Sequence, residues 1–302
     1  MEKKRVRLVV LIAPALIAAA ALFGICVGVV FFRGAPQGFS GFAMGSLLDG
    51  TVWVTGLPYP GLSGDFARSM QSLEDELLTA EEAPPLALEI YEASGGAFSP
   101  YLGALTKLWS VDDEPYLPTQ AEINQALQKR ELDLGAYGKG AACDEALDMI
   151  TSMTMKGAVV NLGGNIATYG RKPWNKPFRI ALRDPKGEAN QTIGVFTLKG
   201  THFISTSGSY EKYFERDGKR YHHIFDPETG YPAERDPGLV SVTVINDHGA
   251  TGDALSTAAF VLGYEDSQSL LQKYSADAIF IYESGAVKYT GSVEDYFKLE
   301  NK

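Results

Sequence analysis

The spacing of hydrophobic residues changes repeatedly between two periods along the chain. Alternating or β-branched apolar residues predict strands over 51–55, 158–161, 178–182, 194–198 and 239–245. Apolar residues at helical spacing predict helices over 63–78, 85–94, 119–128, 140–151, 250–262 and 266–274. A hairpin is expected over 279–290, turning at 283–285. Because helices and strands are interleaved irregularly, the pattern predicts an α+β fold, a single domain of mixed sheet and helix.

The first hydrophobic stretch, 8–32, differs from the others because none of its 25 residues is charged. A helix of this length crosses a hydrocarbon core ~30 Å thick with some tilt. Because four basic residues precede it, we expect a membrane anchor, with 1–7 as a basic cytoplasmic tail and the body outside the cytoplasm. Residues 33–41, which include Pro36 and several glycines, are expected to form a linker before a folded domain at 42–302.

Two other interpretations of the N-terminus remain open. A cleaved signal peptide is disfavoured because the apolar run exceeds the usual length of about 7–15 residues, and because Phe31-Phe32-Arg33 lacks the small residues of a cleavage site. A lipid anchor at Cys26 is disfavoured because Ile25 precedes it, where lipoprotein signals have a small residue.

Composition and charge narrow the classes of function. The net charge is −10, and the first 33 residues hold five basic residues against one acidic residue, so the body is more acidic than the whole chain. An acidic body argues against a nucleic-acid partner, which requires a basic surface. The two cysteines, Cys26 and Cys143, lie far apart and outside any Cys-x-x-Cys motif. This excludes a disulfide framework and a zinc site made of cysteines alone.

Four polar segments carry chemistry that a hydrophobic core does not require. In Asp133–Gly140, three glycines allow close backbone approach and positive φ angles, and the segment leads with Lys139 into a predicted helix N-terminus, which suits an anion. In Asn161–Asn165, two amides flank Gly163 and Gly164 at the end of a strand, which suits a hydrogen-bonding heterocycle. A plain glycine-rich turn and a plain hairpin turn are the alternatives for these two segments.

The third segment joins a Ser/Thr-rich loop at Ser205–Tyr210 to an acidic turn at His222–Pro232 that begins with two histidines. Histidine is the usual proton acceptor near neutral pH. Neighbouring side chains of an extended chain point to opposite faces, so His222 and His223 are not expected to share a zinc ion. A structural role for the histidines is the alternative.

The fourth segment, Thr251–Thr257, opens an apolar helix. Asp253 and Thr257 are four residues apart, so a carboxylate and a hydroxyl lie on the same helical face. Such hard oxygen ligands suit Mg²⁺, which retains waters and binds substrate phosphates. Capping of the helix by Thr251 or Asp253 is the alternative. Together the four segments offer a metal site, an anion site and a proton acceptor, which are the requirements of phosphoryl transfer.

In this order, the segments resemble the FAD:protein FMN transferase family, also called the ApbE family. The resemblance runs from about residue 42 to residue 264. It implies an α+β catalytic domain with a T-fold-like sheet, and an enzyme that transfers FMN from FAD to a Thr or Ser of another protein and releases AMP. The segments that carry it are MGS (44–46), SGGAFSP (94–100), DLGAYGKGAACDEAL (133–147), VVNLGGNI (159–166), TSGSYEKYF (206–214), HHIFDPETGYP (222–232) and TGDALSTAAFVLG (251–263).

The resemblance also implies roles for individual residues. The side chains of Asp253 and Thr257 and the carbonyl of Gly138 would bind Mg²⁺, and His223 would accept the proton of the acceptor hydroxyl. The implied partner is an acceptor flavoprotein, expected to be a membrane or extracytoplasmic electron-transfer protein. The candidate FAD-binding residues are Met44, Asp133, Lys139, Asn161, Gly163, Gly164, Ser207 and Gly208.

The chain departs from the family pattern in three places. Ser99 stands where the family has Asp, and the stretches near 79–85 and 129–133 are shorter than in the family. Two other functions remain open. One is a Mg²⁺-dependent FAD pyrophosphatase, in which water replaces the acceptor hydroxyl. The other is a non-catalytic FAD-binding module, which the shortened stretches favour and the intact His223 and Asp253 motifs disfavour.

Overall fold

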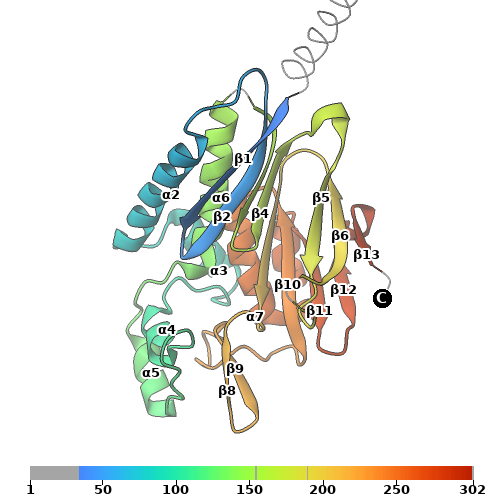
Figure 1. Ribbon diagram of the computed structural model, residues 1–302. Helices are drawn as coiled ribbons and strands as arrows, with labels where there is room; N and C mark the ends of the chain where they lie inside the picture. Colours follow the sequence, from blue (N-terminus) through green and yellow to red (C-terminus); the bar gives the residue numbers. More distant parts are fainter. Residues whose placement is uncertain (1–33, 154, 189, 301–302) are drawn as a thin grey trace, which may run out of the picture.

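The computed structural model describes residues 34–300 except 154 and 189 (Figure 1). The expected cytoplasmic tail at 1–7, the expected membrane segment at 8–32 and Cys26 lie outside the described residues. Within the described part of the chain, no helix is both long enough and apolar enough to cross a membrane.

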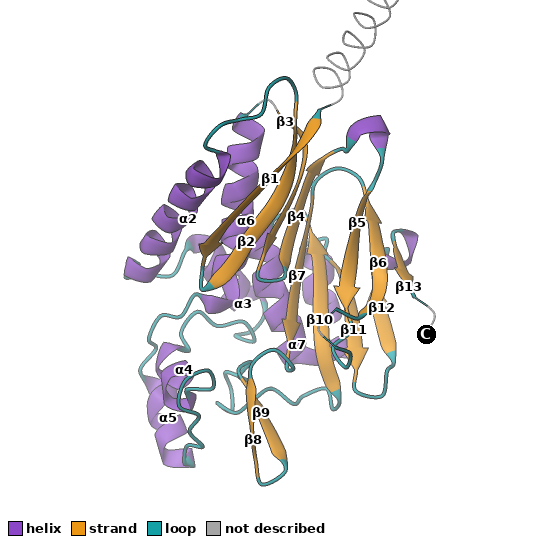
Figure 2. Cartoon of the chain, viewed as in Figure 1, coloured by secondary structure: helices purple, strands orange, loops and turns teal. Residues whose placement is uncertain are grey.

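An antiparallel sheet of eight strands forms the centre of the molecule (Figure 2). Its order is β1-β2-β3-β4-β7-β10-β11-β12. Because alternate residues of a strand face opposite sides, the inner strands of the sheet supply apolar side chains to both of its faces. The strands are β1 (Ala35–Ala43), β2 (Ser46–Val54), β3 (Met155–Leu162), β4 (Asn165–Gly170), β7 (His202–Gly208), β10 (Leu239–Asn246), β11 (Asp277–Tyr282) and β12 (Val287–Thr290).

Helices cover one face of this sheet (Figure 2). Leu62, Phe66 and Met70 recur every four residues on the first of them and are buried, since they form one apolar stripe. Phe66 stacks on Phe39 of β1, with ring centroids 4.2 Å apart. The helices of this layer are α2 (Leu62–Thr79), α3 (Pro85–Ala93), α6 (Gly135–Ser152) and α7 (Gly249–Lys273).

A second sheet of three strands, in the order β13-β6-β5, covers the other face. Phe178 and Phe196 from this sheet are buried in one apolar cluster with Ile204 and Ile281 of the central sheet. This cluster forms a second core between the two sheets. The strands are β5 (Phe178–Arg183), β6 (Thr192–Leu198) and β13 (Phe297–Leu299), and two short 3₁₀ helices lie at Pro173–Asn175 and Val293–Asp295.

A separate lobe at the lower end of Figure 1 is built around Trp109. The Trp109 ring is fully buried, and its indole N–H donates a hydrogen bond of 3.0 Å to the carbonyl oxygen of Gly230. Rings of Phe225 and Tyr231 pack against it at 5.6 and 5.7 Å between centroids. The elements of this lobe are α4 (Gly103–Trp109), α5 (Gln120–Gln128), β8 (Tyr213–Arg216) and β9 (Lys219–His222).

The predicted strands, the helices over 63–78, 85–94 and 119–128, and the terminal hairpin are confirmed, with some boundaries extended. The two helices expected over 250–262 and 266–274 are parts of α7, which is irregular at Gly263. Gly263 has a φ of 78°, and a Cβ there would lie 2.5 Å from the Cβ of Asp236. The change of direction at this glycine therefore explains why the helical pattern is interrupted.

The expectations for two segments that contain several glycines are wrong. The segment expected to be a linker, 33–41, belongs from residue 35 onward to β1, which pairs with β2 along its whole length. The glycine-rich segment at Asp133–Gly140 is not a turn before the helix, because α6 already begins at Gly135. Neither Gly135, Gly138 nor Gly140 has a positive φ. In both places, packing against neighbouring elements outweighs a local composition typical of loops.

Candidate active site

Helices α6 and α7 cross at a pair of glycines. A Cβ atom on Gly140 would collide with the carbonyl oxygen of Gly249, and a Cβ on Gly249 would collide with the carbonyl oxygen of Gly140. The two backbones are therefore in direct contact. Across this contact the backbone N–H of Gly140 donates a hydrogen bond of 2.9 Å to Oδ2 of Asp253, which is 3% exposed. The crossing of the helices thus fixes the Asp253 carboxylate, and of the three glycines in Asp133–Gly140, Gly140 allows the close approach of another backbone.

The N-terminus of α7 is capped by a side chain from α6. The Asp144 carboxylate accepts hydrogen bonds from the backbone N–H groups of Gly249, at 2.7 Å, and Ala250, at 2.8 Å. Burial raises the pKa of Asp144, and these two donors oppose the rise. Asp144, rather than Thr251 or Asp253, therefore caps the helix. The Asp253 carboxylate instead accepts the hydrogen bond from Gly140.

Asp253 and Thr257 border one cavity of about 240 Å³, which we call the Asp253 cavity. The Thr257 Oγ1 lies 3.1 Å from the Oγ of Ser207, which in turn lies 2.8 Å from the Oγ of Ser256. Ser207 and Gly208 also border this cavity, from the end of β7. The expectation that Asp253 and Thr257 present their oxygens on one face of the helix agrees with this placement.

The oxygen atoms of Asp253 and Thr257 are ligands that suit Mg²⁺ better than zinc. Among the described residues, no group of three or more His, Cys, Asp or Glu side chains could hold a metal ion. One carboxylate and one hydroxyl leave most positions around a cation to carbonyl groups, water and substrate phosphates, which is how Mg²⁺ is commonly bound. Gly138, the expected carbonyl ligand, borders a neighbouring cavity instead of this one.

His223 borders the Asp253 cavity as well. Its Nδ1 lies 3.2 Å from the carbonyl oxygen of Lys212. Because a carbonyl oxygen can only accept, Nδ1 donates this hydrogen bond and Nε2 keeps its lone pair. Burial lowers the pKa of His223 to about 4, so the ring is neutral near pH 7. A neutral ring with a lone pair on Nε2 can take a proton from a substrate.

The neighbouring histidine points into the core. His222 is 6% exposed, and its ring meets Phe260 of α7 edge to face at 5.6 Å between centroids. Its Nδ1 accepts a hydrogen bond of 3.3 Å from the backbone N–H of Ile224. Since His222 does not border the cavity that His223 borders, the prediction that the two rings face different ways is confirmed.

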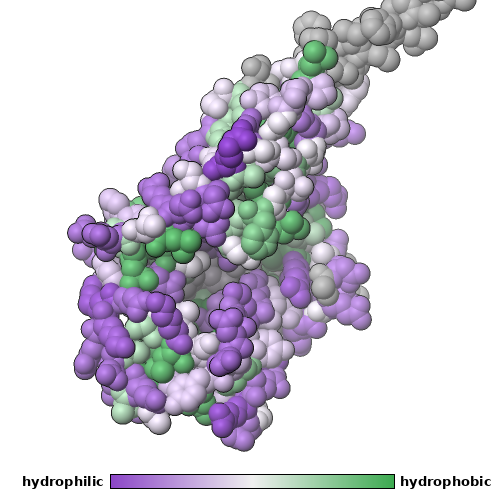
Figure 3. Space-filling view, turned by 60° about the vertical axis from the view of Figure 1, so that its left-hand side comes forward, coloured by the Kyte–Doolittle hydropathy of each residue, from purple (hydrophilic) through white to green (hydrophobic). Residues whose placement is uncertain are grey.

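A larger cavity of about 710 Å³ adjoins the Asp253 cavity, and we call it the Met44 cavity. Met44, Gly138 and Gly163 border only the larger one. Figure 3 shows a hollow in this side of the molecule, above the lobe that contains α4 and α5. The two cavities are neighbours, because both are bordered by the residues Thr106, Asp133, Gly135, Lys139, Glu211 and Lys212.

Two of the predicted FAD-binding residues, Asn161 and Gly164, border neither cavity. The Asn161 side chain donates to Oδ1 of Asp49 at 3.0 Å and accepts from the N–H of Gly164 at 3.2 Å. Gly163 and Gly164 have φ angles of 54° and 92°. The contacts of Asn161 therefore hold the turn between β3 and β4, which is the hairpin alternative. Of this turn, only Gly163 reaches the Met44 cavity.

Sequence reasoning missed several residues that border the Asp253 cavity. Glu211 and Lys212 follow the TSGSY motif directly, so their neighbourhood could have indicated them. Burial raises the pKa of Glu211, and the Lys139 ammonium opposes this rise. Asp112 and Thr106 come from the Trp109 lobe, and nothing in their local sequence indicates the site.

The comparisons with known proteins agree with the resemblance. Residues 82–280 match the model of the ApbE family. The chain is 35% identical over 249 residues to an FAD:protein FMN transferase of Treponema pallidum, covering 69% of this chain and 67% of that protein. It is 37% identical over 208 residues to one from Klebsiella pneumoniae, covering 61% of this chain and 63% of that protein. The chain thus spans about two thirds of the length of these curated relatives.

The fold matches solved structures of the same kind. The crystal structure of the ApbE protein of Thermotoga maritima covers 87% of this chain and 99% of its own, with a TM-score of 0.75 and 27% sequence identity. The helix-covered antiparallel sheet described above is therefore an ApbE-type fold.

Proposed function

Because this chain belongs to the ApbE family, we propose that it transfers FMN from FAD to a Thr or Ser hydroxyl of an acceptor flavoprotein, with Mg²⁺ held by Asp253 and Thr257. The observation that carries this proposal is that Asp253, Thr257 and His223 border the same cavity of about 240 Å³. The neighbouring Met44 cavity of about 710 Å³ provides room for FAD, since ligand pockets usually measure ~300–1,000 Å³.

The reaction forms one phosphorus–oxygen bond and breaks another. The acceptor hydroxyl oxygen attacks the phosphorus of the FMN half, the pyrophosphate P–O bond breaks, and AMP leaves with the bond electrons. His223 takes the hydroxyl proton at Nε2, which is free because Nδ1 donates to Lys212. Lys139, which borders both cavities, places its ammonium beside the phosphates. Mg²⁺, when bound, would neutralise charge on the phosphate oxygens.

The supporting contacts keep these groups in place. The Gly140 N–H holds the Asp253 carboxylate, and the Ser207 hydroxyl holds the hydroxyl of Thr257. Phosphoryl transfer depends mainly on such positioning, because the protein contributes little covalent chemistry.

The test is to incubate the full chain, purified in detergent, with FAD, Mg²⁺ and a candidate acceptor protein, and to weigh all products. We expect the acceptor to gain the mass of FMN less water, with one AMP released for each FMN attached. Release of free FMN and AMP from an unmodified acceptor would favour the FAD pyrophosphatase. Tight binding of FAD without any cleavage would favour the non-catalytic binding module.

We also propose that 8–32 anchors the chain in the membrane with the catalytic domain outside the cytoplasm, where a membrane or extracytoplasmic electron-transfer protein would be the acceptor. The uncharged run and the basic residues before it support this proposal. Protease added to intact cells should remove the domain and leave a small anchor. A full-length chain that stays protected, or a domain found free in the medium, would contradict the proposed location.

A further inference from the structure

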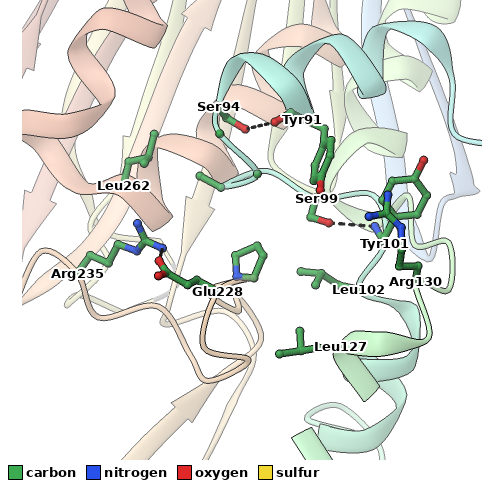
Figure 4. A pocket seen from close by; sticks show the side chains of 14 residues that line it. Tyr91, Ser94, Ser99, Tyr101, Leu102, Leu127, Arg130, Glu228, Arg235 and Leu262 are labelled. Carbon is green, nitrogen blue, oxygen red and sulfur yellow. Dashed lines mark hydrogen bonds and ion pairs between the residues drawn. The ribbon is translucent and has the colours of Figure 1, made fainter. Parts of the chain in front are cut away.

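A third cavity, of about 330 Å³, adjoins the Asp253 cavity, and we call it the Ser94 cavity (Figure 4). Ala97, Ser99 and Leu102 border both of these cavities. No residue borders both the Ser94 cavity and the Met44 cavity. The Asp253 cavity therefore lies between a larger space on one side and a smaller space on the other.

The Ser94 cavity contains one arginine that has no acidic partner among the described residues. The guanidinium of Arg130 lies over the ring of Tyr101, 4.2 Å from its centroid, and none of the ion pairs in this part of the chain involves it. The other arginine of the cavity, Arg235, is already neutralised by Asp226 at 2.8 Å and Glu228 at 2.7 Å. Side-chain hydrogen bonds to Tyr91 and Tyr101 raise the pKa of Arg130, so the guanidinium stays charged. A guanidinium has five N–H donors, so the remaining ones can bind a carboxylate.

The position of Arg130 is fixed by the short segment that follows α5. The N–H of Gly103 donates to the carbonyl oxygen of Glu131 at 2.9 Å, and the N–H of Asp133 donates to that of Pro100 at 2.8 Å. These bonds tie 130–133 to the loop that lines the Ser94 cavity.

The rest of the lining suits a polypeptide. Leu102, Leu127 and Leu262 supply apolar surface, as Figure 4 shows. Gly95 and Gly96 expose backbone, and a Cβ on Gly95 would meet nothing within 4 Å. Most of the exposed lining is polar, so the cavity offers hydrogen bonds to a polypeptide backbone as well as apolar contacts to its side chains. By contrast, the cation available for phosphate, Lys139, lies on the Met44 side.

We propose that the Ser94 cavity receives the acceptor polypeptide next to its Thr or Ser, and that Arg130 binds an acidic side chain of that segment. This inference rests on the proposed transfer reaction, in which two substrates must reach one phosphorus atom from different sides. FAD takes the Met44 cavity, which has more than twice the volume of the Ser94 cavity. The acceptor then enters from the remaining side, and its hydroxyl reaches the Asp253 cavity past Ala97 and Ser99.

The experiment measures peptide binding and peptide modification separately. The probes are fluorescent peptides with one Thr and either Asp or Asn at each neighbouring position in turn. The variants of the full chain are Arg130→Glu and Arg130→Gln, with Lys129→Glu as the matched control, because Lys129 is exposed and borders none of the three cavities. Fluorescence anisotropy gives the peptide Kd, quenching of the flavin gives the FAD Kd, and mass spectrometry gives FMN transfer.

We expect at least one Asp peptide to bind the wild-type chain about ten-fold more tightly than its Asn counterpart, and Arg130→Glu and Arg130→Gln to remove that preference. Lys129→Glu should keep it, and all variants should keep the wild-type FAD Kd. Equal binding of Asp and Asn peptides, equal effects of Arg130→Glu and Lys129→Glu, or a weakened FAD Kd in the Arg130 variants would overturn the inference. Selective peptide binding without any FMN transfer would support the docking site and contradict the transfer reaction instead.

Discussion

The two walls of the Asp253 cavity are built differently. One wall consists of regular elements, with Asp253 and Thr257 on α7 and Ser207 at the end of β7. The other part of the lining, the loop wall, consists of connecting segments that carry Asp112 and His223. Regular elements packed backbone to backbone hold a group within a fraction of an ångström, whereas loops vary and adjust to partners. In the proposed reaction, the rigid wall would therefore neutralise the phosphate charge, and the adaptable wall would contact the second substrate.

Removing the carboxylate of the rigid wall should have the largest effect. Asp253→Ala is expected to slow FMN transfer by about 10³-fold or more, because a metal site supplies several kcal/mol and each 1.36 kcal/mol is tenfold in rate. Asp112→Ala, on the loop wall of the same cavity, should slow it far less. Initial rates of FMN attachment at saturating Mg²⁺ give the comparison.

Folding must be separated from chemistry in this test. Asp253→Ala leaves the Gly140 N–H without its acceptor, which costs ~1–3 kcal/mol of stability. Asp253→Asn keeps an acceptor oxygen but loses the charge, so it should fold like the wild type and still fail to transfer FMN. Normal transfer by Asp253→Asn, with normal dependence on Mg²⁺, would show that the rigid wall does not bind the metal.

The loop wall is tested through its histidine. His223→Ala should lower transfer by ~10²–10⁴-fold, the usual contribution of a general base. His222→Gln should lower it much less, since the His222 ring packs on Phe260 outside the cavity. The rates of both variants are compared by mass spectrometry of the acceptor. If the two substitutions lower the rate of FMN transfer equally, His223 cannot be the proton acceptor by itself.

The residues of the rigid wall were easier to predict from the sequence than those of the loop wall. Asp253 and Thr257 follow from helical spacing, because positions four residues apart share a face wherever the helix packs. The opposite directions of His222 and His223 follow from an extended chain in the same way. Asp112, and likewise Arg130 at the Ser94 cavity, could not be found, since tertiary packing of the Trp109 lobe brings their segments to these cavities. The contacts around Trp109 join residues that are distant in sequence, so a local pattern does not predict them.

Local composition was misleading where packing supplied the stability. The glycines and Pro36 of β1 are typical of a linker, yet Phe39 stacks on Phe66 and draws the segment into the sheet. The polar TSGS segment was expected to be a loop, but residues up to Gly208 belong to β7 in the middle of the central sheet. β7 pairs with β4 and β10, which lie far from it in the sequence, and β1 pairs with β2, which itself carries apolar residues. A local sequence pattern therefore reveals neither pairing.

The contact between α6 and α7 should be intolerant of a single methyl group. Gly140→Ala is expected to destabilise the protein by about 1–3 kcal/mol, because the Cβ would collide with the Gly249 carbonyl and overpacking of this kind forces the backbone to shift. Gly64→Ala in α2 is the matched control, since a Cβ there would meet only the Arg68 guanidinium at 3.5 Å. The control should be neutral or stabilising by ~0.5–1 kcal/mol. Urea unfolding measures both, and equal midpoints would mean that the helices do not depend on this contact.

The smallest expected effect is on the pH dependence of stability, and it comes from His222, where the loop wall meets α7. Burial lowers the pKa of His222 to about 4, whereas in the unfolded chain it is ~6.5. The unfolded state therefore binds a proton more readily between these values, so stability is full above pH ~6.5 and is lost as pH falls toward 4. His222→Gln cannot gain this charge, so its free energy of unfolding should fall less over that range, by ~1–3 kcal/mol. The difference between the two proteins in urea unfolding at several pH values isolates His222, because groups such as Asp144 contribute equally to both. Parallel curves would show that the His222 ring already accepts a proton in the folded protein at its ordinary pKa.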